Sequence, residues 1–273
     1  MINYTDRLTA LMCDIVGRVQ SLSFIDPESF LVFARFGRTG ADGAYATCHC
    51  LCLPTSDPGY YFWRDSSSGQ ITRRSEWFVS KSPEVVIGQR RLDYLISFAL
   101  PRFADQRLEH SRKRLHYPGA EPWVAKLDTV IHELYHIDPN RTGIRQMLRD
   151  DGRETHRCHS PEFFSHVAEL VREYLATNPD PAVYEFLKDD FDGLSERHGR
   201  IVGTAFRTFP SYPQHYLERL ADQPGGEVAT TSIVPIHAPN KQRRYTEADL
   251  DMREFFTQSS RRCVNCLRQD QAA

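Results

Sequence analysis

Two histidines four residues apart, His132 and His136, enclose a glutamate in the segment IHELYHIDP. Residues four apart lie one above the other on the same face of an α-helix, so both imidazoles could bind one tetrahedral metal ion. Glu133 lies about 100° around the helix from His132 and could accept a proton from a water whose pKa the metal lowers. The spacing therefore predicts a Zn²⁺ site with His132 and His136 as ligands and Glu133 as general acid/base.

The residues around this motif predict that it lies on a helix. Pro122 suits the first turn of a helix, and Pro139 prevents its continuation beyond the second histidine. Between them, apolar residues recur at helical spacing, namely Val124, Leu127, Val130, Ile131 and Leu134. We therefore expect a helix over residues 122–138, with both histidines near its C-terminal end.

A catalytic zinc site requires a third protein ligand and an open position for water. His159 precedes Ser160-Pro161-Glu162, where a capping serine, a proline and an acidic residue predict a helix from 161 to about 176. Because a residue directly before a capped helix is held firmly, His159 is favoured as the third ligand. His156 and Cys158 remain alternatives, since Zn²⁺ accepts imidazole and thiolate ligands alike.

Hydrolysis of a peptide bond would also need a donor for the developing oxyanion. Tyr135 and His166, together with His156, are available, and the sequence does not choose between them. The predicted strand from Tyr94 to Leu100 is a candidate edge on which an extended substrate could pair through main-chain hydrogen bonds. An ordinary core strand is the alternative interpretation of the same residues.

The two motifs together resemble a known group of enzymes. His-Glu-Leu-Tyr-His followed by His-Ser-Pro-Glu-Phe is similar to the SprT-like and YgjP-type zincin metallopeptidases, and to phage-type and bacterial metallopeptidases with a His-Glu-Leu-any-His-Ile core. Softer similarities upstream extend the resemblance over about residues 20–175. It implies a zincin-like fold and a zinc-dependent peptidase. By this resemblance His132, His136 and His159 would be the ligands and Glu133 the general acid/base.

The order of the predicted elements indicates an α+β protein. A first amphipathic helix is expected over residues 5–20, followed by a mostly antiparallel sheet whose strands are separated by glycine- and proline-rich turns. The sheet would pack on the helix that carries the two histidines and on the following helix with His159. The expected strands are Phe30–Phe36, Ala44–Leu53, Tyr60–Trp63, Trp77–Val79, Val85–Ile87, Tyr94–Leu100 and Ile201–Phe209.

The sequence predicts that the C-terminal part of the chain is an appendage to the main domain. Pro224-Gly225-Gly226 is the best linker signal, so we expect a metallopeptidase domain over residues 1–222 and an appendage over 223–273. The appendage would contain a strand near 228–235 and a short helix from Thr246 to about Phe256, opened by a capping box. A tail with Cys263 and Cys266 follows. Its spacing is half of a zinc ribbon, and whether it binds a second zinc is left open.

The composition of the whole chain argues against nucleic-acid-binding, membrane-spanning and secreted proteins. Lys and Arg number 34 against 36 Asp and Glu, so the chain as a whole lacks the basic surplus typical of nucleic-acid binding. Short basic clusters such as Arg112-Lys113-Arg114 are interpreted as solvated surface, and association with nucleic acid is kept as an alternative. No membrane-spanning stretch or signal peptide is visible, and seven cysteines without a regular framework indicate a reducing cytoplasm. Cys48, Cys50 and Cys52 should share one buried face of a strand.

Two functions from different classes follow. The first is a zinc metallopeptidase acting on a protein or peptide substrate, with an open position at the metal. The second is a non-catalytic, zinc-stabilised binding or adaptor protein with a protein or nucleic-acid partner, in which a fourth protein ligand such as Cys158 closes the site. The identity of the substrate, the oligomeric state and any regulation lie beyond the sequence.

Overall fold

The computed structural model describes residues 1–40, 42–52, 58–64, 71–81, 83–140, 143–145, 159, 161–208, 216–219 and 244–257. Within these residues the chain is a mixed α+β protein of helices and small mixed sheets, as the order of predicted elements indicates. Helix α1, Tyr4–Arg18, begins where the Asn3 side chain caps the backbone N–H of Asp6. Its apolar stripe, which includes Leu8 and Ile15, is fully buried.

The sheet closest to the histidine motif has three strands in the order β2-β8-β3, with bounds Phe30–Gly37, Tyr94–Pro101 and Ala46–Cys50. Strand β8 is parallel to β2 and antiparallel to β3. The sheet is therefore mixed, whereas a mostly antiparallel sheet was expected. After β2 the chain first forms β3 and several other strands, and only then returns to place β8 between β2 and β3.

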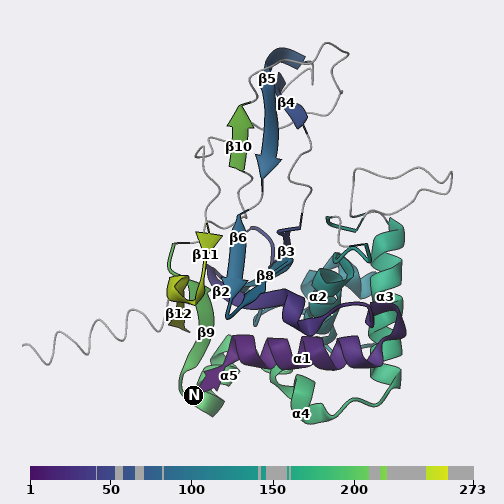
Figure 1. Ribbon diagram of the computed structural model, residues 1–273. Helices are drawn as coiled ribbons and strands as arrows, with labels where there is room; N and C mark the ends of the chain where they lie inside the picture. Colours follow the sequence, from purple (N-terminus) through teal and green to yellow (C-terminus); the bar gives the residue numbers. More distant parts are fainter. Residues whose placement is uncertain are drawn as a thin grey trace, which may run out of the picture.

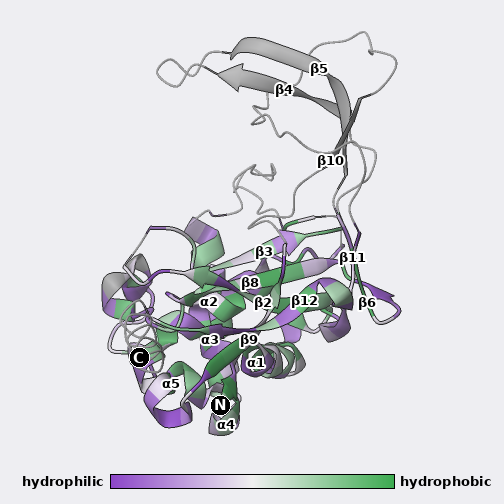
Figure 2. Cartoon of the chain, turned by 90° about the vertical axis from the view of Figure 1, so that its left-hand side faces the viewer, coloured by the Kyte–Doolittle hydropathy of each residue, from purple (hydrophilic) through white to green (hydrophobic). Residues whose placement is uncertain are grey.

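The central position of β8 decides the role of this strand. All eight of its residues are buried, and it has a hydrogen-bonded neighbour on each side. The expectation of an edge strand at Tyr94–Leu100 is therefore wrong, and the core-strand interpretation is right. Alternate residues of β8 face two different clusters: Ile96 and Phe98 lie in the main core with α1, and Leu95 lies in a smaller cluster on the other face. Figure 2 shows β8 as a predominantly hydrophobic strand.

Helix α2, Val124–Tyr135, carries the histidine motif and contacts β3, α1 and α3. It is shorter at both ends than the expected 122–138, because His136 is its C-cap and Ile137 leaves the helix to form an isolated β-bridge with Ile144. Helix α3, Pro161–Ala176, follows the sequence expectation. Figure 1 shows α2 between the β2-β8-β3 sheet and α3.

The segment after Thr246 differs from the sequence expectation. The capping box forms between Thr246 and Asp249, but it opens only the single 3₁₀ turn η6, Glu247–Asp249. Residues Leu250–Phe255 then form strand β12, antiparallel to β9, Ile201–Phe206. The predicted helix over 246–256 is therefore wrong: pairing along the edge of β9 satisfies the backbone groups that a helix would have satisfied internally. The parallel strand β1, Ile2–Asn3, completes this sheet in the order β1-β9-β12.

The remaining elements complete the described chain. The strands are β4 Pro58–Arg64, β5 Ile71–Lys81, β6 Glu84–Ile87, β7 Arg90–Arg91, β10 Tyr216–Arg219 and β11 Arg244–Tyr245, and β4, β5 and β6 confirm three expected strands. The helices are α4 Pro181–Tyr184 and α5 Phe191–His198, and the 3₁₀ turns are η1 Gln20–Leu22, η2 Pro27–Ser29, η3 Leu108–His110, η4 Arg112–Leu115 and η5 Glu185–Leu187.

Three sequence expectations lie outside the described residues: the linker at 224–226, the strand at 228–235 and the tail with Cys263 and Cys266. Among the helices of the described part, none combines the length and apolar character needed to cross a membrane.

Candidate metal centre

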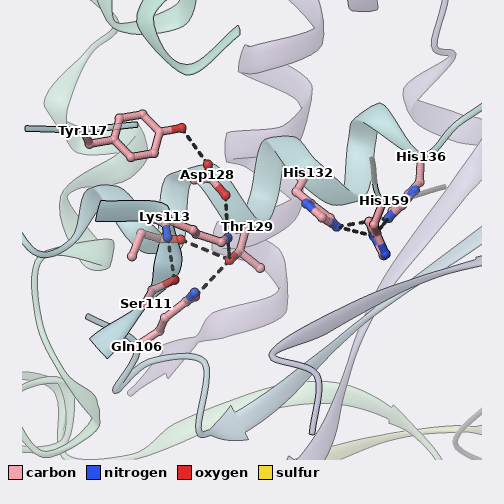
Figure 3. A network of polar contacts seen from close by, with 10 residues as sticks. Gln106, Ser111, Lys113, Tyr117, Asp128, Thr129, His132, His136 and His159 are labelled. Atoms are coloured by element: carbon pink, nitrogen blue, oxygen red, sulfur yellow. Dashed lines mark hydrogen bonds and ion pairs between the residues drawn. The ribbon is translucent and has the colours of Figure 1, made fainter. Parts of the chain in front are cut away.

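Three histidine rings converge beside the C-terminal end of α2. The Nε2 atoms of His132 and His136 are 3.1 Å apart, and the Nε2 atom of His159 lies 3.0 Å from each of them. Figure 3 shows His132 and His136 on the helix and His159 reaching them from the other side. In the part of the chain that the structure describes, this is the one group of three or more metal-ligating side chains close enough to share an ion.

The donor set fits a metal ion. Three Nε2 atoms that lie 3.0–3.1 Å from one another cannot all be satisfied by hydrogen bonds among themselves, because a neutral imidazole has one donor and one acceptor nitrogen. Burial lowers the pKa of all three rings, that of His136 to about 3, with added repulsion from His159 and Arg145. Neutral rings keep the lone pairs that a cation requires. Zn²⁺ is commonly held by three protein ligands of this type, with a fourth position open to water.

Aromatic packing holds the three rings in place. His159 lies two residues before Pro161, where α3 begins, and its ring stacks on Phe164 with ring centroids 5.8 Å apart. Phe163 is fully buried and contacts the edges or faces of all three histidine rings. The apolar surroundings account for the depressed pKa values and restrict the rotation of the imidazoles.

Glu133 lies beside the histidines and is almost fully buried, with 4% of its surface exposed. Burial raises the pKa of its carboxyl to about 8, and a hydrogen bond from the backbone N–H of Cys48 opposes this effect in part. The positive charges of Lys113 and Arg35 oppose it as well. A carboxyl group with such a pKa can both accept and release a proton near neutral pH.

A cavity of about 400 Å³ opens at the histidine cluster. One wall is the β3 region and the other is α2, so the cavity brings Glu133 and the three rings into contact with the same space. The lining residues are Ala44, Tyr45, Ala46, Thr47, Cys48, Lys113, Thr129, His132, Glu133, His136, Ile144 and His159.

The outer edge of β3 faces this cavity. The backbone carbonyl of Tyr45 accepts a bond from Ala99, and the N–H of Leu51 donates to Asp93, so the odd-numbered residues of this segment pair with β8. In an antiparallel pair the main-chain groups of the intervening residues point away from the partner strand. The N–H of Cys48 obeys this alternation, because it bonds to Glu133 instead of to β8.

Lys113 is a site residue that the sequence interpretation missed. It lines the cavity from η4, and its Nζ lies 2.5 Å from Asp128 Oδ1 and 2.6 Å from Thr129 Oγ1, both on α2. Tyr117 donates a 2.6 Å hydrogen bond to the other oxygen of Asp128 (Figure 3). Nothing in the local sequence separates Lys113 from the exposed Arg114 beside it. Only the buried Asp128, 15 residues later, could have suggested a partner.

The structure places the other expected site residues as follows. The hydroxyl of Tyr135 lies 3.3 Å from Nδ1 of His166, and neither residue lines the cavity, so these two expected oxyanion donors point elsewhere. The alternative ligands His156 and Cys158 lie outside the described residues.

Comparisons with known proteins identify no relative. A scan against protein-family models finds no matching family, and searches of curated proteins and of solved structures find no match either.

Proposed function

We propose that this protein is a zinc-dependent metallopeptidase with a zincin-like active site, similar to the SprT-like and YgjP-type enzymes. The observation that carries the proposal is the triangle of Nε2 atoms of His132, His136 and His159, with Glu133 lining the same cavity. Three neutral imidazoles beside a buried carboxyl group are the parts required for metal-assisted hydrolysis.

His132, His136 and His159 would hold the ion, and Glu133 would manage the proton. A bound Zn²⁺ lowers the pKa of a coordinated water and polarises a carbonyl oxygen. The carboxylate of Glu133 accepts the proton of the attacking water and returns it to the leaving amine. The hydrogen bond from the N–H of Cys48 holds this carboxylate in position through both steps.

Lys113 would stabilise the oxyanion that develops on the substrate carbonyl. Its Nζ is fixed by Asp128 and Thr129, which lie one turn of α2 before the first ligand, His132. An ammonium group has three N–H bonds, and these two partners leave the third to be directed into the cavity. A donor that is already oriented stabilises developing charge without further reorganisation. This role replaces the one considered for Tyr135 and His166.

The outer edge of β3 would bind the substrate. An extended peptide can add a strand to an exposed sheet edge, and the N–H of Ala46 and the carbonyl of Cys48 point away from β8 toward the cavity. The scissile carbonyl of a peptide bound in this way would pass close to Glu133. Binding through main-chain hydrogen bonds requires an extended substrate backbone and depends less on the identity of the substrate side chains.

Glu133→Gln is the decisive variant. The amide keeps the size and hydrogen-bonding capacity of the side chain but cannot accept the proton. We expect the purified wild-type protein to bind one zinc per chain and to hydrolyse unfolded protein substrates. The variant should keep its zinc and lose activity by a factor of about 10² or more.

Full activity in Glu133→Gln would contradict the proposal. So would a protein that binds zinc tightly with no coordinated water, because a fourth protein ligand then closes the site. Metal spectroscopy of the wild type against Cys158→Ser distinguishes the open site of a peptidase from the closed site of a zinc-stabilised adaptor.

A further inference from the structure

Two thiols lie in contact at the end of the strand that borders the cavity. The Sγ atoms of Cys50 and Cys52 are 3.3 Å apart. Cys50 is the last residue of β3, and Cys52 follows just after the strand ends. A disulfide requires sulfurs about 2.05 Å apart and Cα atoms at most about 6.8 Å apart. Cys52 lies beyond the last residue of β3, and its sulfur needs to approach that of Cys50 by only about 1.2 Å to reach this bond length.

The two thiols have different chemical characters. The hydrogen bond from the Cys50 thiol, with a smaller contribution from the Tyr94 hydroxyl, lowers the pKa of Cys52 to about 7. The same hydrogen bond, together with burial, raises the pKa of Cys50. Cys52 is half-buried, whereas Cys50 is 6% exposed. One thiol is therefore accessible and easily ionised, and the other is shielded next to it, as in a pair of attacking and resolving cysteines.

We propose that Cys50 and Cys52 form a reversible disulfide when the protein meets a hydroperoxide. The Cys52 thiolate attacks a peroxide oxygen, the O–O bond breaks, and Cys52 becomes a sulfenic acid while hydroxide or an alkoxide leaves. The Cys50 sulfur then attacks the Cys52 sulfur, forms the S–S bond and releases water. In total two thiols lose two electrons and two protons, and hydrogen peroxide is reduced to two molecules of water.

The disulfide would act on the candidate active site through β3. Cys48 lies two residues before Cys50 on the same strand, and its N–H holds the carboxylate of Glu133. Bringing the Cys50 and Cys52 sulfurs to bonding distance shortens the end of this strand and displaces the Cys48 amide. The disulfide itself does not depend on the proposed function, whereas its effect on hydrolysis does.

Peptide mapping of the full-length protein tests the disulfide without any measurement of activity. The purified full-length protein is treated with hydrogen peroxide at neutral pH, alkylated, and cleaved at Arg38 and Arg64, which leaves Cys48, Cys50 and Cys52 in one peptide. We expect this peptide to take up one alkyl group after oxidation and three after subsequent reduction. Cys13, a half-buried thiol on α1 with a raised pKa, is the internal control and should react at least about tenfold more slowly.

Single variants identify the partners. Cys48→Ser should still form the disulfide, and Cys50→Ser should leave Cys52 as a sulfenic acid that dimedone traps. Loss of the disulfide in Cys48→Ser would overturn the inference. So would a peptide that still takes up three alkyl groups after peroxide treatment, with Cys50 and Cys52 oxidised no faster than Cys13. If the disulfide forms but an active wild type keeps its full rate of hydrolysis, the link through Glu133 is wrong while the modification site stands.

Discussion

The backbone N–H of Cys48 donates a hydrogen bond to the carboxylate of Glu133, so the edge of β3 is joined directly to the candidate proton acceptor on α2. This bond uses a main-chain group that points away from β8 and is not needed for the sheet. The strand that would bind the substrate therefore also positions the residue that would act on it.

A proline substitution separates these two roles of β3. Cys48→Pro removes the N–H group whose hydrogen bond Glu133 accepts, and it leaves every hydrogen bond between β3 and β8 intact. Edge strands tolerate proline where the N–H faces outward. We expect a folded, zinc-binding protein whose turnover falls about tenfold or more, measured by hydrolysis of an unfolded protein. The matched variant Thr47→Pro removes an N–H that faces β8 and should cost about 1–3 kcal/mol in urea unfolding. Equal effects of the two variants on stability would contradict the assigned register.

Removal of His159 tests the third ligand. His159→Ala should lower the affinity for zinc by more than about 100-fold, because loss of a direct ligand exceeds the 10- to 100-fold effect of losing one of its supporting contacts. His166→Ala is the control: His166 is an exposed histidine on α3 whose ring faces Tyr135 instead of the cavity. Competition with a chromogenic chelator measures both affinities. Unchanged affinity in His159→Ala would assign the third position to another donor such as His156 or Cys158.

Lys113 should affect the chemical step more than substrate binding. Lys113→Met is expected to lower kcat by about 10²-fold with little change in KM, as for the loss of one oxyanion donor. Lys113→Arg should restore part of the rate, since it keeps a charged donor opposite Asp128. Arg114→Met, at the exposed neighbouring position, should behave as the wild type. A rise in KM at constant kcat would instead make Lys113 a residue for substrate binding.

Stability should fall in acid because of His49. This ring is 3% exposed and hydrogen-bonded to Ser97 at 3.0 Å, and burial, with repulsion from Arg35, lowers its pKa to about 3. In the unfolded chain His49 binds a proton near pH 6.5, whereas in the folded protein it stays neutral down to about pH 3. The contribution of His49 to the free energy of unfolding is therefore fully present above pH 6.5 and is lost as the pH decreases toward 3. The contribution of His49 approaches about 1.4 kcal/mol per pH unit in this range.

Urea unfolding at pH 7.5, 5.5 and 4.5 measures this slope. His49→Gln, which keeps a side chain able to bond Ser97, should show a shallower loss of stability between pH 6 and 4 than the wild type. Because both proteins retain His132, His136 and His159, the difference in slope isolates His49. Identical slopes would contradict the shifted pKa.

Local patterns in the sequence determined most of the helices and the first two candidate ligands, His132 and His136. The spacing of His132 and His136 lies within one helix, where 3.6 residues per turn decides which side chains share a face. The proline and capping signals before α3 also act over a few residues, and they placed His159 at a helix start. Such features depend on short-range geometry, which a sequence displays directly.

Only the tertiary structure decided which distant residues meet. The capping box at Thr246 is a local helix signal, but the following residues, Leu250–Phe255, pair with the edge of β9 and therefore form a strand. Lys113 differs from the exposed Arg114 only because η4 packs it against Asp128, and β8 is central only because β2 and β3 both pair with it. Long-range pairing and burial of charge depend on the whole fold, and no short segment encodes them.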